Sequence, residues 1–433
     1  MKAVIMAGGK GTRLSSLLKD IPKPMIQIEG KPVLEHQIEN LKENGITEII
    51  LVIGHLGEVI ENYFGDGSNW NVSICYYREE TPLGTAGALF YIKKHLTDDF
   101  ILLFGDVFVN VNFARMINFH SEKQAAATLF SHPNSHPYDS DILVVNEENR
   151  VIDWMYKNLE RKQSYANLVN AGVYIFSPKI FKYIEDGSKR DLEKNVITQS
   201  MQHGEVFAYR STEYVKDIGT PERYKKVCDD YRKGICASRN LKNKQKCIFL
   251  DRDGTINKYV GLLTEETQME LEDHVAEAIS KINQSEYLAV VITNQPVIAR
   301  GDCTFAGLEA IHNRMQVLLG DTGCYVDDIY YCPHHPDRGF EGEIAELKIK
   351  CDCRKPHTGM LRQAADDHNI DLEQSWIIGD TTMDIQTGKN AGMHTMLVLT
   401  GECGKDGKFN VKPDCIRNNL SECIDYITGR KNS

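Results

Sequence analysis

Residues 246–255 have the sequence KCIFLDRDGT, an apolar run that ends in two carboxylates, a glycine and a threonine. Later apolar runs of similar length alternate with segments of helical pattern, and these runs are LAVVITNQ at 288–295, DDIYYC at 327–332, SWIIGD at 375–380 and TMLVLT at 395–400. Strands that alternate with helices form mostly parallel sheets with helices on both faces. We therefore expect residues 247–433 to form one doubly wound α/β domain.

The same alternation precedes this stretch in the N-terminal half. Its apolar runs are KAVIMAG at 2–8, EIILVIG at 48–54, FILLFGD at 100–106 and NAGVYIF at 170–176. A chain of 433 residues exceeds what one hydrophobic core usually supports. The polar and basic segment 233–246, KGICASRNLKNKQK, has the composition of a linker. The sequence thus predicts two Rossmann-like α/β domains, 1–232 and 247–433.

Charge and composition argue against several classes of protein. The net charge of −11 is opposite in sign to the basic surface that non-specific nucleic-acid binding requires. No apolar run reaches the roughly 18 residues of a membrane span, and the first run is too short for a secretory signal. The 12 cysteines are mostly scattered, which favours reduced thiols over a disulfide framework. We expect a cytoplasmic protein that binds neither nucleic acid nor membrane, and the sequence leaves its oligomeric state open.

A glycine-rich loop follows the first apolar run. Its residues of interest are Gly8, Gly9, Gly11, Thr12 and Arg13. Glycines at the end of a strand allow backbone N–H groups to approach phosphate oxygens. A tight structural turn would explain a lone glycine loop equally well. Two nearby cations, Arg13 and Lys23, favour the interpretation that this loop binds a triphosphate.

The segments GGKGTRL and PKPM resemble the signature of the sugar-1-phosphate nucleotidylyltransferases. Further segments match that family in its order: TPLGTAGAL at 81–89, FGD at 104–106, NAGVYIF at 170–176, DLEKNVI at 191–197 and KDIGTPERY at 216–224. The family joins a sugar 1-phosphate to the α-phosphorus of a nucleoside triphosphate and releases pyrophosphate. Such a protein aligns two reactants and neutralises charge, and it needs no nucleophile of its own.

The resemblance implies roles for individual residues. Arg13 and Lys23 are the catalytic cations at the triphosphate, and Asp106 and Asp217 hold Mg²⁺. The glycine-rich loop binds the triphosphate, and the implied contacts to nucleoside and sugar are Leu83, Gly84, Gly87, Lys157 and Gly172. Many relatives carry a glutamate that touches sugar hydroxyls where this chain has Tyr156, so we expect an unusual sugar.

Asp251 and Asp253 lie two positions apart, directly after the apolar run CIFL. Two carboxylates in one site can take different roles: the first attacks phosphorus, and the second, protonated, serves the leaving oxygen. A surface turn rich in Asp and Gly is the alternative interpretation. Three further segments argue against it: ITN ending at Asn294, Arg354-Lys355-Pro356, and GDTTMD with Asp380 and Asp384.

This set of segments resembles the haloacid-dehalogenase-type phosphatases. The resemblance implies that Asp251 forms an aspartyl-phosphate and that Asp253 is the general acid/base. Thr293 and Lys355 bind the phosphoryl oxygens, where the positive charge offsets that of the transferring group. Asp384 orients the neighbouring loop. The implied Mg²⁺ ligands are Asp251, Asp253 and Asp380.

Cys332 and His334 form one close pair of metal-ligand types, and Cys351 and Cys353 form another. Thiolate and imidazole ligands suit tetrahedral zinc with no position left open for catalysis. The adjacent His335 could replace His334, and buried free thiols or a disulfide are further alternatives. We expect a structural Zn²⁺ that staples a substrate loop.

Too few residues separate the first two apolar runs of the C-terminal domain to form a cap over its core. Among the capless phosphatases, YYCPHHP, CDCRKPHTGML and NQPVIARG resemble the D-glycero-D-manno-heptose 1,7-bisphosphate 7-phosphatases. Histidinol-phosphate phosphatases share the zinc loop and are the nearest alternative. Arg300 and Arg354, together with Asn294, are the implied contacts to the sugar or its second phosphate.

The two resemblances together narrow the substrate. A phosphatase that removes the distal phosphate of a sugar bisphosphate leaves a sugar 1-phosphate, which a nucleotidylyltransferase consumes. The combination predicts a bifunctional enzyme of GDP-heptose synthesis for bacterial surface polysaccharides, with GTP as co-substrate and Mg²⁺ and structural Zn²⁺ as cofactors. Three alternatives stay open: the same chemistry on another sugar such as mannose, a histidinol-phosphate phosphatase joined to a transferase, and an N-terminal half that only senses nucleotides.

Overall fold

The computed structural model describes residues 1–9, 21–161 and 163–429. The chain divides into two compact units. Unit 1 comprises Met1–His132, Leu143–Met155 and Val169–Asn240, and unit 2 comprises Pro133–Ile142, Tyr156–Leu168 and Leu241–Ser433. No helix among the described residues is long and apolar enough to cross a membrane.

Unit 1 is built around β1 (Lys2–Met6), which lies inside a mixed sheet. The strand order is β10-β9-β11-β6-β1-β4-β5, and β8 pairs with both β11 and β12. β1 runs parallel to β4 (Glu48–Ile53) and β6 (Phe100–Phe104), whereas β11 (Val169–Phe176) runs antiparallel to β6. The parallel pairing places the ends of β1 and β6 at one edge of the sheet, where the glycine-rich loop and Asp106 follow.

Unit 1 also contains the other strands of this sheet, two separate two-stranded sheets, β13-β7 and β2-β3, and its helices. The other strands are β2 (Gln27–Ile28), β3 (Lys31–Pro32), β5 (Ser73–Arg78), β7 (Val107–Asn110), β8 (Ala127–His132), β9 (Ile142–Val145), β10 (Val151–Met155), β12 (Val206–Arg210) and β13 (Tyr214–Asp217). The helices are α1 (Val33–Glu43), α2 (Gly57–Phe64), α3 (Gly87–Ile92), α4 (Phe113–Lys123), α5 (Thr198–Gln202), α6 (Pro221–Arg232) and α7 (Ile235–Ser238). β13 pairs antiparallel with β7, so that Asp217 lies opposite Val107.

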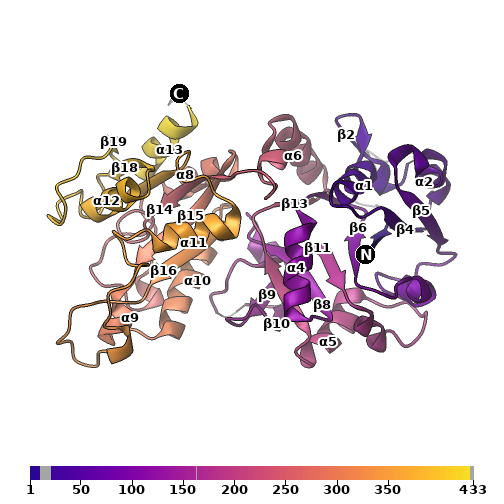
Figure 1. The fold of residues 1–433 in the computed structure, drawn as a ribbon, viewed down its shortest axis with the longest axis horizontal. Helices are drawn as coiled ribbons and strands as arrows, with labels where there is room; N and C mark the ends of the chain where they lie inside the picture. Colours follow the sequence, from indigo (N-terminus) through magenta and orange to yellow (C-terminus); the bar gives the residue numbers. More distant parts are fainter. Residues whose placement is uncertain (10–20, 162, 430–433) are drawn as a thin grey trace. The chain divides into compact units, whose positions relative to one another are not determined.

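Unit 2 contains a parallel sheet of strand order β16-β15-β14-β17-β18-β19 (Figure 1). The strands are β14 (Lys246–Leu250), β15 (Tyr287–Asn294), β16 (Asp328–Cys332), β17 (Trp376–Gly379), β18 (His394–Val398) and β19 (Cys415–Arg417). The helices are α8 (Val275–Asn283), α9 (Pro296–Arg300), α10 (Phe305–Asp321), α11 (Gly359–His368), α12 (Thr382–Asn390) and α13 (Leu420–Thr428). Ile248 and Leu250 of β14 pack in one core with residues of α8, and Phe249 packs in another with residues of α11. Helices therefore cover both faces of the sheet, and the doubly wound α/β fold expected from the sequence is confirmed.

The segment 233–246, expected as a linker, carries buried and hydrogen-bonded residues. Ile235 of α7 is buried in a core of unit 1. Gln245 belongs to unit 2, where its backbone forms hydrogen bonds of 2.9 Å with both Asn369 and Asp371. Although the segment is polar in composition, each of its ends is attached to the unit it adjoins.

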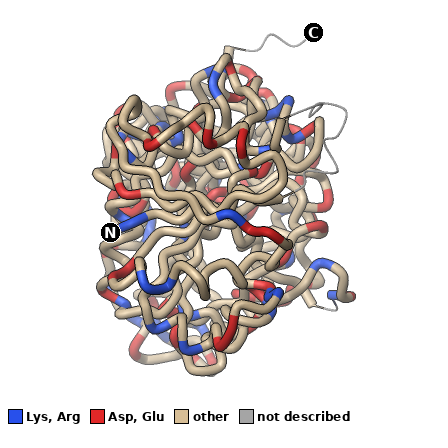
Figure 2. The backbone as a smooth tube through the Cα atoms, turned by 90° about the vertical axis from the view of Figure 1, so that its right-hand side faces the viewer, with Lys and Arg blue, Asp and Glu red and all other residues tan. Residues whose placement is uncertain are grey.

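Basic and acidic residues are interspersed along the described chain in Figure 2. The 61 acidic residues of the full sequence outnumber the 50 basic ones.

A partly buried ion pair joins α11 to β16 in unit 2. His368 Nε2 lies 2.9 Å from Asp328 Oδ2. Burial lowers the pKa of His368, but the hydrogen bond and charge of Asp328, together with the charges of Asp367 and Asp327, raise it more, so the net shift is upward. A histidine whose pKa is raised in the folded state stabilises the fold when the pH is below the ordinary histidine pKa of about 6.5. This contribution is lost as the pH rises through the folded-state pKa.

We expect His368→Gln to lower the free energy of unfolding of unit 2 by about 1–3 kcal/mol near pH 6 and by less near pH 9. Hydrogen exchange of peptides from β16 and α11 across a urea series measures this for unit 2 alone. His274→Gln removes an exposed pairing with Glu277 and is the control, with an expected change below about 0.5 kcal/mol. An equal loss at both pH values would contradict the ion-pair account.

Candidate active sites

The glycine-rich loop begins where β1 ends beside β4. A Cβ at Gly8 would lie 2.6 Å from Glu79 Oε2, and a Cβ at Gly54 would lie 3.0 Å from the Gly8 carbonyl oxygen. This close approach of two backbone segments requires the absence of a side chain. A Cβ at Gly9 would meet no other described atom within 4 Å. The other residues expected to bind the triphosphate lie outside the described residues, and these are Gly11, Thr12 and Arg13.

Lys23, Asp106 and Asp217 come together at the carboxyl edge of the unit 1 sheet. Lys23 is buried and its Nζ donates to Asp106 Oδ2. Asp217 is next to Asp106 along the paired strands, because the Ile218 N–H donates to the Asp106 carbonyl at 2.9 Å. Asp106 lies in the turn between β6 and β7 and Asp217 ends β13, and such a pair of carboxylates at one edge fits Mg²⁺, which takes few protein carboxylates and keeps several waters.

Arg223 is a further cation at this edge that sequence reasoning did not assign to the site. Its Nη1 lies 2.9 Å from Asp217 Oδ2. Burial raises the pKa of Asp217, but the charge and hydrogen bonds of Arg223 lower it more, and the charge of Lys23 adds to this. Asp217 is therefore ionised. The family segment KDIGTPERY contains Arg223, but its pairing depends on the turn into α6.

The segment expected to contact the nucleoside packs closely against residues 188–190. The Arg190 N–H donates to the Leu83 carbonyl at 2.9 Å. A Cβ at Gly84 would lie 2.4 Å from the Arg190 carbonyl oxygen, and a Cβ at Gly87 would lie 2.5 Å from that of Ser188. Packing alone therefore requires both glycines, and their contact with a nucleoside stays a prediction.

Gly172 and Lys157, both expected on the sugar side, lie in different units. Gly172 has a φ of 74°, and a Cβ there would lie 3.1 Å from Phe104 Cδ2 at the end of β6. The backbone at Gly172 therefore lies against the end of β6, the strand that Asp106 follows. Lys157 lies in a segment of unit 2, where its N–H donates to Asp141 Oδ1 at 2.8 Å. Its contact with a sugar phosphate stays a prediction.

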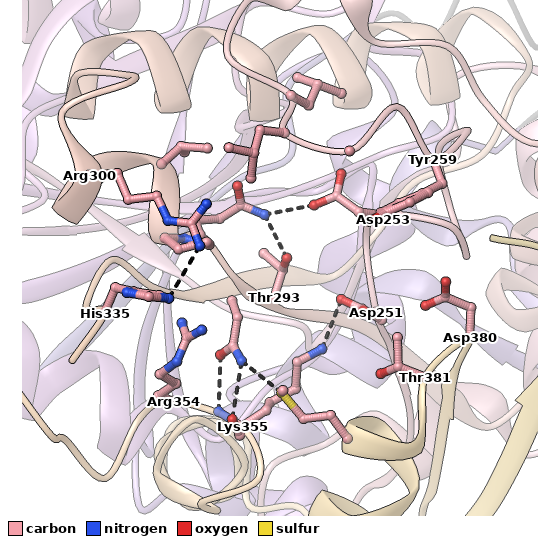
Figure 3. Close-up of a pocket in the computed structure, with 18 of the residues that line it drawn as sticks. Asp251, Asp253, Tyr259, Thr293, Arg300, His335, Arg354, Lys355, Asp380 and Thr381 are labelled. Carbon is pink, nitrogen blue, oxygen red and sulfur yellow. Dashed lines mark hydrogen bonds and ion pairs between the residues drawn. The ribbon is translucent and has the colours of Figure 1, made fainter. Parts of the chain in front are cut away.

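The carboxyl edge of the unit 2 sheet carries a pocket of about 430 Å³ (Figure 3). Asp251 follows β14, Thr293 lies at the end of β15, and Asp380 follows β17. All three line the pocket together with Asp253 and Lys355. The structure therefore brings together side chains that the sequence places at the ends of separate strands.

Lys355 is the central cation of this pocket. Its Nζ lies 2.9 Å from Asp251 Oδ1 and 2.6 Å from Asp384 Oδ1. Burial lowers the pKa of Lys355, but the charges of these carboxylates raise it more, so the net shift is upward. Asn294 holds the Lys355 backbone, accepting from its N–H at 3.0 Å and donating to its carbonyl at 3.2 Å. Lys355 is thus fixed beside the expected nucleophile with its charge retained.

Asp251, Asp380 and Asp384 form a buried cluster whose ligand oxygens lie within 4.8 Å of one another. Burial raises the pKa of both Asp251 and Asp380, and neighbouring carboxylates raise it further, since Lys355 offsets only part of the charge. Asp380 Oδ1 is buried without a hydrogen-bond partner among the described residues. A divalent cation that prefers oxygen ligands would offset the charge of these carboxylates and give Asp380 Oδ1 a partner. The cluster therefore fits Mg²⁺. Asp384 also orients the adjacent loop, as expected, by accepting from the Thr381 N–H at 3.2 Å.

The Asp253 carboxylate lies outside this cluster and is held by Arg252. Arg252 is fully buried, and its Nη2 donates to both Asp253 oxygens at 2.9 and 2.8 Å. Gln295 Nε2 donates to Asp253 Oδ2 at 2.9 Å and to Thr293 Oγ1 at 2.8 Å. Burial raises the pKa of Asp253, but the charge of Arg252 and these hydrogen bonds lower it more. The sequence-based expectation of a protonated Asp253 therefore differs from the structure, because neither Arg252 nor Gln295 was recognised as its partner.

The other end of the pocket is cationic. Arg300 and Arg354 line it together with His335 (Figure 3). Arg300 Nη2 lies 3.3 Å from His335 Nε2, and its guanidinium lies 4.5 Å from the centroid of Phe340. Arg354 Nη1 donates to the His334 carbonyl at 3.0 Å. These contacts hold two planar cations in place for an anionic group. Sequence reasoning considered His335 only as an alternative zinc ligand.

Cys332, His334, Cys351 and Cys353 form a second cluster of metal-ligand types. The three Sγ atoms lie 3.2 to 3.5 Å apart, and His334 Nδ1 lies 3.3 Å from Cys353 Sγ. A tetrahedral zinc ion with Zn–S bonds of about 2.3 Å separates its ligands by roughly 3.8 Å. The four atoms are therefore spaced to surround one ion and fit Zn²⁺, with His334 and not His335 in the group.

Two family models match this chain. Nucleotidyl transferase matches residues 2–234, and HAD-hydrolase-like matches residues 352–423. The first match covers more than half of the 433 residues.

Named relatives match the two kinds of domain separately. The chain is 44% identical over 156 residues to the D-glycero-beta-D-manno-heptose-1,7-bisphosphate 7-phosphatase of Salmonella typhi, covering 36% of this chain and 81% of that one. It is 32% identical over 243 residues to the mannose-1-phosphate guanylyltransferase of Mycobacterium tuberculosis, covering 55% of this chain and 67% of that one. The chain spans only 63% of a similar probable guanylyltransferase of Oryza sativa. A solved structure of HddC from Yersinia pseudotuberculosis complexed with GMP-PN is also similar, with a TM-score of 0.46 and 28% identity over 53% of this chain and 99% of that one.

We expect the purified chain to contain about one Zn²⁺ and Cys351→Ser to lose it, because a structural site needs all four ligands. The following residues Arg354 and Lys355 would lose their anchor, and phosphatase activity would fall by about 10- to 100-fold. Elemental analysis and phosphate release measure the two effects. Cys415→Ser changes a partly buried cysteine outside the cluster and should affect neither. Zinc-free native protein, or full zinc content in Cys351→Ser, would refute the assignment.

Proposed function

Because this chain belongs to the nucleotidyl transferase family through residues 2–234 and to the HAD-like hydrolases through its C-terminal half, we propose that it catalyses two consecutive steps of GDP-heptose synthesis. The phosphatase removes the 7-phosphate of D-glycero-D-manno-heptose 1,7-bisphosphate. The transferase joins the resulting heptose 1-phosphate to GMP from GTP and releases pyrophosphate. The phosphatase releases a sugar 1-phosphate, which is the class of substrate that the transferase uses. We place both reactions in the cytoplasm.

The observation that carries the phosphatase assignment is the two-ended pocket of unit 2. Asp251 and Lys355 lie at one end, and Arg300 and Arg354 line the other. A sugar with phosphates at both ends matches this arrangement, since one phosphate meets the nucleophile while the guanidinium groups bind the other. The similarity to a heptose bisphosphate phosphatase supports the same substrate.

The phosphatase residues act in two steps. A carboxylate oxygen of Asp251 attacks phosphorus, the bond to the sugar oxygen breaks, and that oxygen takes up a proton from solvent that is relayed through Asp253. Water then attacks the aspartyl-phosphate and gives its proton to Asp253, which releases phosphate and restores Asp251. Arg252 stabilises the ionised form of Asp253 that accepts this proton. Lys355 offsets negative charge throughout, and Mg²⁺ held by the carboxylate cluster would supply further neutralisation when bound.

The transferase residues align reactants and offset charge. A phosphate oxygen of the sugar 1-phosphate attacks the α-phosphorus of GTP, and the bond to the pyrophosphate leaving group breaks. Lys23 and Arg223 are the described cations beside Asp106 and Asp217, where Mg²⁺ would neutralise the triphosphate when bound. No protein nucleophile is needed in this displacement.

Mannose 1-phosphate is a second candidate substrate for the transferase. It is favoured by the 32% identity to a mannose-1-phosphate guanylyltransferase. Heptose 1-phosphate is preferred because a heptose bisphosphate phosphatase-like domain in the same chain would supply it.

The proposal is tested by giving the purified chain Mg²⁺ and each anomer of heptose 1,7-bisphosphate, with and without GTP. Mass spectrometry follows phosphate, pyrophosphate and nucleotide sugar. We expect phosphate release without GTP, and GDP-heptose only when GTP is added. Phosphate release without any nucleotide sugar would support the phosphatase and reject GTP or heptose 1-phosphate as transferase substrate.

Asp251→Asn should reduce phosphate release by about 1,000-fold, because the amide cannot form the aspartyl-phosphate. Pyrophosphate release from GTP and heptose 1-phosphate should stay within about twofold of the native rate. Asp106→Asn is the reciprocal control and should impair only nucleotidyl transfer. Loss of both activities in Asp251→Asn would contradict two independent sites.

A further inference from the structure

Three polar side chains meet between β11 and a π-helix, η7 (Leu192–Ile197). Asn170 Nδ2 donates to Glu193 Oε1 at 2.8 Å, and the Tyr174 hydroxyl donates to the same oxygen at 2.9 Å. Asn170 Nδ2 also donates to the Tyr174 hydroxyl at 2.8 Å. Two donors that converge on one carboxylate oxygen fix the orientation of the Glu193 carboxyl group. The mechanism proposed above uses none of these residues.

These side chains lie toward the edge of the sheet that carries the transferase site. β11 runs antiparallel beside β6, with Val173 opposite Leu103 (Figure 1). Residues that precede Val173 in β11 therefore approach the segment after β6, which contains Asp106. The contact that a Cβ at Gly172 would make with Phe104 agrees with this path.

The segment before Glu193 contacts the expected nucleoside segment. The Leu192 N–H donates to Thr85 Oγ1 at 2.7 Å, and Gly84 forms a β-bridge with Arg190. Glu193 thus follows residues that support the nucleoside segment, while Asn170 approaches the metal-binding edge. A sugar joined to the nucleotide through its 1-phosphate must lie between these two regions.

Two independent features indicate a ligand at this place. A π-helix is rare in proteins and is frequent at functional sites, and η7 carries Glu193 in its first turn. Asn170 Oδ1 is buried without a hydrogen-bond partner among the described residues. Native structures rarely leave a buried acceptor without a donor, and a sugar hydroxyl is a donor of the right kind.

A purely structural role for Glu193 is the alternative. Burial raises the pKa of Tyr174, and the charge of Glu193 raises it further, so the hydroxyl stays protonated and requires an acceptor. A neutral acceptor would serve with less loss of hydration than a carboxylate. Tyr183 and Glu205 provide a comparison within the same unit, because the Tyr183 hydroxyl donates to Glu205 Oε2 at 2.8 Å.

We propose that Glu193, oriented by Tyr174 and Asn170, accepts hydrogen bonds from hydroxyl groups of the sugar 1-phosphate and so selects the sugar of the transferase. This inference rests on the proposed nucleotidyl transfer. Carboxylates accept from hydroxyls without donating, so the site favours a ligand with hydroxyl donors and disfavours one with an anionic group at that position.

The test uses Glu193→Gln in the full chain, with Glu205→Gln as the matched control. Pyrophosphate release is measured while heptose 1-phosphate, mannose 1-phosphate and GTP are varied in turn. We expect Glu193→Gln to raise the KM for the sugar 1-phosphate by about 10- to 100-fold, the effect of losing a hydrogen bond to a charged group. The KM for GTP should change by less than about twofold, and Tyr174→Phe should give a smaller rise of the sugar KM.

An unchanged sugar KM in Glu193→Gln would overturn the inference. So would a parallel rise of the KM for GTP, or an equal effect of Glu205→Gln, because either result would indicate a packing defect. If the native chain forms no nucleotide sugar from either sugar, the proposed function fails, and calorimetry with both sugar 1-phosphates replaces kinetics. Weaker binding to Glu193→Gln than to the native chain would then support the role of Glu193, whereas equal binding, or no binding to the native chain, would overturn it.

Discussion

Parallel pairing of neighbouring strands places their carboxyl ends at one edge of a sheet, and both candidate sites depend on this constraint. In unit 2, β14 pairs in parallel with β15 and β17, so Asp251, Thr293 and Asp380 meet although long segments separate them in the chain. In unit 1, the parallel pairing of β1 and β6 brings Gly8 and Gly9 to the edge where Asp106 follows β6. Inside the sheet every backbone group is paired, so polar side chains can approach a ligand only where the strands end.

The two sites differ in how charge is balanced. In unit 2, Lys355 Nζ contacts two of the three clustered carboxylates, those of Asp251 and Asp384, and burial together with the neighbouring carboxylates raises the pKa of Asp251 and of Asp380. In unit 1, Asp106 is paired with Lys23, and Asp217 is paired with Arg223. A hydrolase site that takes up a divalent cation suits the first arrangement. The arrangement in unit 1 suits a triphosphate, because Lys23 and Arg223 can offset the negative charge of its phosphates.

Some site residues were predictable because each follows an apolar run within a short motif. Asp251 and Asp380 are of this kind, and the pattern of strand followed by carboxylate is visible in the sequence. Arg252 lies in the same motif as Asp251, but no linear pattern shows that a charged residue between two aspartates is fully buried and holds one of them. Gln295 was not predictable for a similar reason, because its hydrogen bond to Asp253 depends on how β15 pairs with β14.

The amino-acid sequence was enough to predict two α/β domains of the doubly wound class and the kind of chemistry that each supports. These conclusions depend on hydrophobic alternation and on motifs a few residues long, which are local properties of the chain. The tertiary structure was needed to show that His335 contacts Arg300 and that Glu193 meets Asn170, and it confirmed His334 as the histidine of the cysteine cluster. Such choices depend on distances of a few ångströms between residues far apart in the sequence, and strand pairing and the paths of the loops set those distances.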